Sequence, residues 1–155
     1  MRSFSSKISG LSLAEVLVAI AIIAIIGFVS ITFLSGYSST ESLSKSADVA
    51  ISLLSEARAR TISAKAASKY GIHFETSKMV LFKGSVYSAS DSNNVNYPIE
   101  SHTEILSINL SGGATSVVFD RLDGDTANTG TIIFASKSDT SKTKTVTIYA
   151  TGLAE

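Results

Sequence analysis

The chain has 155 residues, of which 45% are hydrophobic and 17% are charged, and its 13 basic residues balance its 13 acidic residues. This balance leaves no global basic excess with which to bind nucleic acid. The absence of cysteine excludes disulfides and thiolate metal sites, and the length leaves room for one small globular domain beside an N-terminal helix.

The first predicted element is an apolar helix behind a short basic leader. The leader, residues 1–10, carries two basic residues and ends at Gly10. The run Leu11–Leu34 is long enough to cross a bilayer, since about 20 apolar residues span the hydrocarbon core. We therefore expect a transmembrane helix over residues 11–35. Because the basic residues precede it, the N-terminus is expected in the cytoplasm and the rest of the chain outside.

One acidic residue, Glu15, interrupts this apolar run. A carboxylate near the end of a membrane helix costs a few kcal/mol unless it is paired or reaches the headgroups, so it normally marks a function. We expect Glu15 to pair with a positive group. The alternative is that Glu15 lies at the membrane interface and contacts water or lipid headgroups.

A second helical pattern covers residues 36–69. Apolar residues from Leu43 to Ala66 recur every three or four positions, which is typical of an amphipathic helix that continues the first one. The opposite side carries a basic cluster that we interpret as a solvated face, with contact to an anionic polymer or a neighbouring subunit as the alternative. The cluster comprises Arg58, Arg60, Lys65 and Lys69.

From Tyr70 onward, apolar residues alternate with polar ones, which is typical of half-buried strands. The segments that fit are residues 70–75, 78–83, 105–110, 116–119, 130–135 and 145–150. A short turn at Thr76 and Ser77 joins the first two segments into a predicted hairpin.

The stretch Ser88–Tyr97 is rich in serine and asparagine and precedes the only proline, Pro98, so we expect an exposed loop there. Residues 70–155 are expected to form a β-rich head. The sequence thus predicts an α+β fold. In it, a long N-terminal helix, transmembrane and then amphipathic, packs against a C-terminal antiparallel β-sheet head.

The N-terminal pattern resembles the type IV prepilin family, which includes the pseudopilins of type II secretion. This pattern is a short leader that ends at Gly10, followed by Leu11, Glu15 and a long apolar helix. The resemblance implies the pilin fold and cleavage between Gly10 and Leu11 by a prepilin peptidase. It also implies methylation of the new N-terminus at Leu11, where the commonest residue in the family is Phe. In this family Glu15 would pair with the amino terminus of a neighbouring subunit during assembly.

The second half is most similar to the minor type, which contains the H pseudopilin of secretion systems and the FimT-like pilus proteins. The similar segments are Leu53–Ile62, Gly71–Phe74 and a block from Val117 to Leu153. The resemblance implies as partners other pilin or pseudopilin subunits, the prepilin peptidase, an inner-membrane assembly platform and membrane lipid. Some FimT-like proteins bind DNA through basic residues near the C-terminus. This chain ends Gly-Leu-Ala-Glu, so nucleic acid is not an expected partner.

Other candidates for chemistry are few. Asp120, Asp123 and Asp125 provide oxygen ligands that suit calcium, but their spacing differs from an EF-hand loop, and Asp is also a common turn residue. We expect no metal or cofactor, with calcium at these three residues as the alternative. His73, expected to face outward from a strand, and His102 are the only histidines, and no catalytic motif includes either. No enzyme is predicted.

The sequence therefore predicts a structural protein, a minor pilin or pseudopilin subunit. It would be a single-pass protein of the cytoplasmic (inner) membrane with its head outside, and would then enter an extracytoplasmic filament. Both a type IV pilus and a type II secretion pseudopilus stay open as the machine. The alternative function is an uncleaved single-span signal-anchor protein whose β-rich head binds a ligand at the cell surface.

Overall fold

The structure is a computed structural model that describes residues 12–63 and 68–155, without the side chains of residues 29–39. The chain divides into two compact units, of which the first ends at Tyr37 and the second begins at Ser38. The expected leader, residues 1–10, and the expected cleavage site lie outside the described residues.

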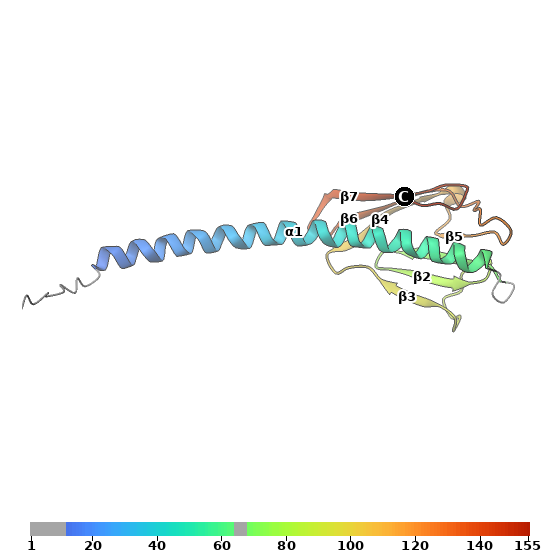
Figure 1. Cartoon of the computed structure of the whole chain (residues 1–155), viewed down its shortest axis with the longest axis horizontal. Coiled ribbons are helices and arrows are strands. Elements are labelled where there is room, and N and C mark those ends of the chain that lie inside the picture. The colour runs from blue at the N-terminus through green and yellow to red at the C-terminus, as the bar shows by residue number, and fades with distance from the viewer. Residues whose placement is uncertain (1–11, 64–67) are drawn as a thin grey trace, which may run out of the picture. The chain divides into compact units, whose positions relative to one another are not determined.

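The only α-helix among the described residues is α1 (Leu13–Ile62), drawn from blue to green in Figure 1. Its described side chains fall into two stretches, Leu13–Phe28 in the first unit and Thr40–Ile62 in the second. Every described side chain of the first stretch is exposed, whereas the second stretch buries one face. The two stretches therefore have different environments.

No helix among the described residues is long and apolar enough to cross a membrane. The stretch Leu13–Phe28 is shorter than the about 20 residues that a span needs. The expected span also counted residues 29–34, whose side chains lie outside the description. This finding contradicts the predicted transmembrane helix at residues 11–35. It equally contradicts the predicted location as a single-pass protein of the inner membrane.

Residues 70–148 form two antiparallel sheets (Figure 1). The first sheet has the strand order β3 (Val95–Pro98), β2 (Lys78–Lys83), β1 (Tyr70–Glu75) and β5 (Ser116–Val118). The second sheet has the order β4 (Thr103–Leu110), β6 (Gly130–Ser136) and β7 (Asp139–Ile148). A short 3₁₀ helix, η2 (Ser111–Gly113), follows β4.

The predicted fold was therefore wrong. It placed one long helix, first transmembrane and then amphipathic, on one β-sheet head. The described helical side chains instead form two shorter stretches in separate units, and the β-rich region carries two sheets. Strands of one sheet and strands of two sheets show the same alternation of buried and exposed residues. The alternation in the sequence therefore did not show that the strands divide into two sheets.

Of the local predictions, the hairpin was right and the exposed loop was wrong in part. The hairpin between β1 and β2 is confirmed, because Glu75 pairs with Lys78 across the Thr76-Ser77 turn. The expected loop at Ser88–Tyr97 was wrong at its end, where β3 pairs with the edge of β2. Pro98 is tolerated there because an edge strand need not use every backbone N–H.

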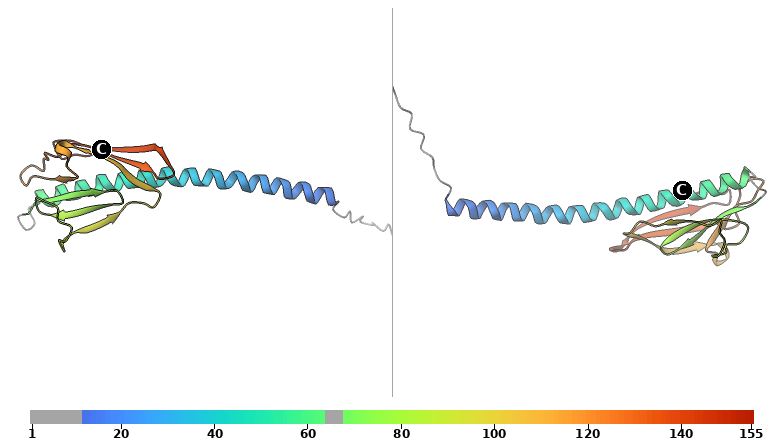
Figure 2. Two further views of the ribbon diagram at one scale, coloured as in Figure 1. Left: turned by 180° about the vertical axis from the view of Figure 1, so that it is seen from behind. Right: turned by 90° about the horizontal axis from the view of Figure 1, so that it is seen from below.

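The core of the second unit lies between α1 and both sheets. Figure 1 shows β2 and β3 along one side of the helix and β4, β6 and β7 along the other, and the right view of Figure 2 shows both sheets on one face of the helix. Each large apolar side chain that is fully buried stabilises the fold by roughly 1.5–3 kcal/mol. The helical residues of the core are Leu43, Ala47, Ala50, Leu53, Leu54 and Ala57, and the sheets contribute Ile72, Phe74, Leu81, Val117, Ile132 and Phe134. The predicted apolar stripe is confirmed at Leu43, Ala47, Ala50, Leu54 and Ala57, whereas Ile62 is exposed.

Candidate functional site

The start of α1 is built by Ser12 and Glu15. The Ser12 hydroxyl accepts a hydrogen bond from the backbone N–H of Glu15 at 3.3 Å, and the Ser12 carbonyl accepts from the same group at 3.1 Å. Ser followed three residues later by Glu is the capping-box spacing, and an acidic first turn suits the helix dipole. Glu15 thus has a local role that the sequence analysis missed, although the spacing from Ser12 was visible. Gly10 and Leu11, its expected companions, lie outside the described residues.

The apolar segment that follows, Leu13–Phe28, leaves its large side chains in solvent. Their exposed fractions run from 44% for Val16 to 82% for Leu13. The exposed residues are Leu13, Val16, Leu17, Val18, Ile20, Ile22, Ile23, Ile25, Ile26 and Phe28. Large contiguous exposed apolar surfaces mark interaction sites, and a helix that is apolar on all sides is normally buried. This segment is the first candidate interaction site.

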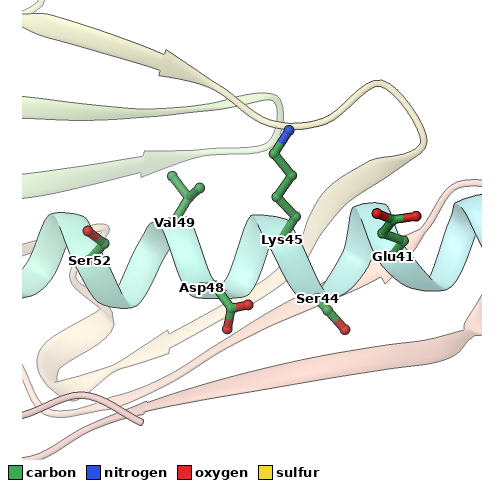
Figure 3. A pocket seen from close by; sticks show the side chains of 6 residues that line it. All are labelled: Glu41, Ser44, Lys45, Asp48, Val49 and Ser52. Carbon is green, nitrogen blue, oxygen red and sulfur yellow. The ribbon is translucent and has the colours of Figure 1, made fainter.

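The outer side of α1 in the second unit carries a shallow hollow of about 440 Å³ (Figure 3). Lys45 points toward the loop before β4, where its Nζ lies 2.6 Å from the carboxylate of Glu100. The hydrogen bond and the charge of Glu100 raise the pKa of Lys45. The lining residues are Glu41, Ser44, Lys45, Asp48, Val49 and Ser52. They include no histidine.

The three acidic residues considered for calcium have partners within the chain. Asp120 pairs with the Nζ of Lys69, and the carboxylate of Asp123 accepts a hydrogen bond from the backbone N–H of Asp125 at 3.0 Å. The backbone N–H of Asp120 donates to the Asp125 carbonyl at 2.8 Å and closes the turn. Within residues 12–63 and 68–155, no group of three or more His, Cys, Asp or Glu residues could hold a metal. The contacts of these residues are those of a turn.

The described members of the basic cluster also have partners. The guanidinium of Arg58 donates from Nε to the Gly124 carbonyl at 3.0 Å and from Nη2 to the Asp123 carbonyl at 3.1 Å. Arg60 forms a 2.5 Å ion pair with Glu56 on the helix surface. The interpretation as a solvated face therefore fits Arg60 but not Arg58, which is half-buried and joins the helix to the loop before β6.

His73 lies on the outer face of the first sheet, as predicted, but it is covered. Its Nδ1 lies 2.9 Å from the Ser116 hydroxyl, and its ring stacks on Tyr87 with centroids 3.9 Å apart. Burial lowers the pKa of His73, although the charge of Glu75 opposes this shift. No short-range motif connects these residues, because Ser116 is 43 positions away from His73.

Comparisons of the chain with models of protein families, with curated proteins and with solved structures found no match. Any functional assignment therefore depends on the residues and contacts described above.

Proposed function

We propose that the chain is a structural subunit of the minor pilin or pseudopilin class, cut by a prepilin peptidase between Gly10 and Leu11. Other subunits of this class are its partners. The apolar segment Leu13–Phe28 assembles with the same segment of its neighbours.

The observation that supports this proposal most is the exposure of the apolar segment. Burial of apolar surface contributes about 25 cal/mol per Å² removed from water, and this segment offers apolar surface on all sides. Contact with several like helices would cover it. Head-to-tail contacts that do not close into a ring generate helical filaments, which is the arrangement proposed here.

Glu15 supports the same proposal. Between Leu13 and Phe28 it is the only charged residue, so its carboxylate would need a positive partner within an apolar assembly. Cleavage after Gly10 would create an amino group on Leu11, close in sequence to Glu15. A neighbouring subunit would then supply that amino group as the partner.

Site-specific cross-linking tests the proposed assembly. The chain has no cysteine, so Leu17→Cys, in the apolar segment, provides a unique thiol. Treatment of the producing cells with a bismaleimide should link Leu17→Cys subunits into dimers. Leu122→Cys is the matched control, because this leucine is 96% exposed in the β-rich unit. The control should stay monomeric, and both thiols should label fully after denaturation. Only monomers from Leu17→Cys would contradict the proposal.

A further inference from the structure

The outer face of the first sheet carries a small cluster of its own. Val80 and Phe82 of β2 are almost completely buried, yet neither belongs to the main core beneath α1. Tyr87, from the loop after β2, lies against Phe82 and against His73, which pairs with Val80 across the sheet. Its ring stacks on His73 and meets Phe82 edge to face at 5.6 Å, and its hydroxyl donates to Glu75 at 3.4 Å. Three contacts therefore hold Tyr87 in place.

A hollow of about 200 Å³ lies beside this cluster, between the loop after β2 and strand β5. We call it the β5 hollow. It is smaller than the roughly 300–1,000 Å³ of pockets for drug-sized ligands, so it suits a molecule about the size of one ring. The lining residues are Ser85, Val86, Tyr87, Ala114, Thr115, Ser116, Val118 and Asn128.

Hydrogen bonds within the chain hold the walls of the β5 hollow. The Ser116 hydroxyl is fixed by His73. The side-chain carbonyl of Asn128 accepts from the backbone N–H of Val118 at 3.3 Å, and the backbone N–H of Asn128 donates to the Thr126 hydroxyl at 3.1 Å. A site whose walls are already ordered loses less conformational entropy on binding.

Several polar groups of the β5 hollow are free to bind a ligand. The hydroxyls of Ser85 and Thr115 and the Nδ2 group of Asn128 make no hydrogen bond to any residue that the structure describes. A hydroxyl both donates and accepts hydrogen bonds, and the amide nitrogen donates them. Together these groups match a ligand whose own groups can both donate and accept hydrogen bonds.

The lining contains no charged side chain. A charged ligand would lose hydration there without gaining an opposite charge, which is costly. The remaining lining, including Val86, Ala114 and Val118, is apolar and suits a surface of C–H groups. The matching chemistry is thus a neutral ring with hydroxyls around its edge.

We propose that the β5 hollow binds one ring of a neutral polyhydroxylated molecule, a single saccharide unit. This site is separate from the apolar segment Leu13–Phe28. It therefore does not depend on the proposed filament function.

Saturation-transfer NMR on the full chain tests this proposal with glucose, galactose, mannose and N-acetylglucosamine as probes. Glucuronate and glucosamine serve as charged comparators. At least one neutral sugar should receive saturation in the millimolar range, and neither charged sugar should compete with it. If no neutral sugar receives saturation, or if a charged sugar binds more tightly, the proposal is overturned.

A pair of variants localises the binding. The double variant Ser85→Ala and Thr115→Val removes two exposed hydroxyls that have no described partner, so the fold should persist. Loss of two hydrogen bonds should weaken sugar affinity about ten-fold. The matched control is Ser92→Ala with Thr143→Val, at exposed positions outside the hollow. Equal affinity in the test and control variants would overturn the assignment to this hollow.

Discussion

The Nε of Arg58 donates a hydrogen bond to the backbone carbonyl of Gly124 at 3.0 Å, although the two residues are 66 positions apart. Arg58 also lies against Gly152, where an added Cβ would come within 2.9 Å of the same Nε. One side chain of α1 thus bonds to the loop before β6 and lies close to the turn after β7.

We predict that Arg58→Ala lowers the free energy of unfolding by about 1–3 kcal/mol, because two backbone carbonyls lose a charged donor. Urea unfolding of the full chain measures this change. Arg60→Ala is the comparison, because its exposed ion pair with Glu56 is worth about 0.3–0.5 kcal/mol. Its guanidinium also lies 5.9 Å from the centre of the Tyr70 ring, a contact worth about 0.5–1 kcal/mol at an exposed site. Equal losses in both variants would show that the contacts of Arg58 are not stabilising.

Gly152→Ala should be more costly than an ordinary glycine substitution. Gly152 has a φ of 74°, and a Cβ there would lie 2.0 Å from the Gly124 carbonyl oxygen. We expect a loss of about 2–4 kcal/mol from left-handed strain and overpacking together. Gly112→Ala separates the two effects, because Gly112 has a φ of 72° and no neighbour within 4 Å of an added Cβ. If both variants lose the same stability, the close approach at Gly152 has no energetic effect.

Stability should fall as the pH decreases through the titration of His73. Burial holds the pKa of His73 below its ordinary value, so the unfolded chain binds a proton more readily than the folded chain. This contribution to stability is complete above about pH 6.5 and is lost as the pH falls toward the folded pKa. Unfolding midpoints measured across this range report it.

The charged groups around His73 are Glu75, which opposes the shift, and Lys78, which supports it. In His73→Gln, which does not titrate, the dependence on pH should become shallower. A wild-type chain that gains stability as the pH falls through this window would contradict the assignment of a lowered pKa.

Two variants separate the local role of Glu15 from its proposed role in assembly. Ser12→Ala removes the helix cap and should cost the helix about 1 kcal/mol while subunits still enter the filament. Glu15→Gln keeps the size of the side chain and removes its charge, and should prevent incorporation. Quantitative blotting of filament fractions measures both. Normal incorporation of Glu15→Gln would refute the proposed pairing with a neighbouring amino terminus.

The sequence predicted features that depend on near neighbours. The buried positions Leu43, Ala47 and Ala50 follow from helical spacing alone, and the hairpin of β1 and β2 follows from a two-residue turn. The predicted transmembrane helix was wrong, because it relied on hydropathy summed over residues that extend beyond Phe28.

Features that depend on distant partners were missed. Strand β3 exists because β2 offers it an edge, and its own sequence, Val-Asn-Tyr-Pro, is a poor strand pattern. The contact of Arg58 with Gly124 and the stack of His73 on Tyr87 likewise join residues with no common motif. Spacing within a sequence does not show which loop will fold over which sheet face.

The most direct test of the proposed function is the intact mass and N-terminal peptide of the chain purified from the cells that produce it. We predict a chain that begins at Leu11 and carries one added methyl group. A chain that still carries residues 1–10 would contradict processing by a prepilin peptidase, and the filament proposal would lose its basis.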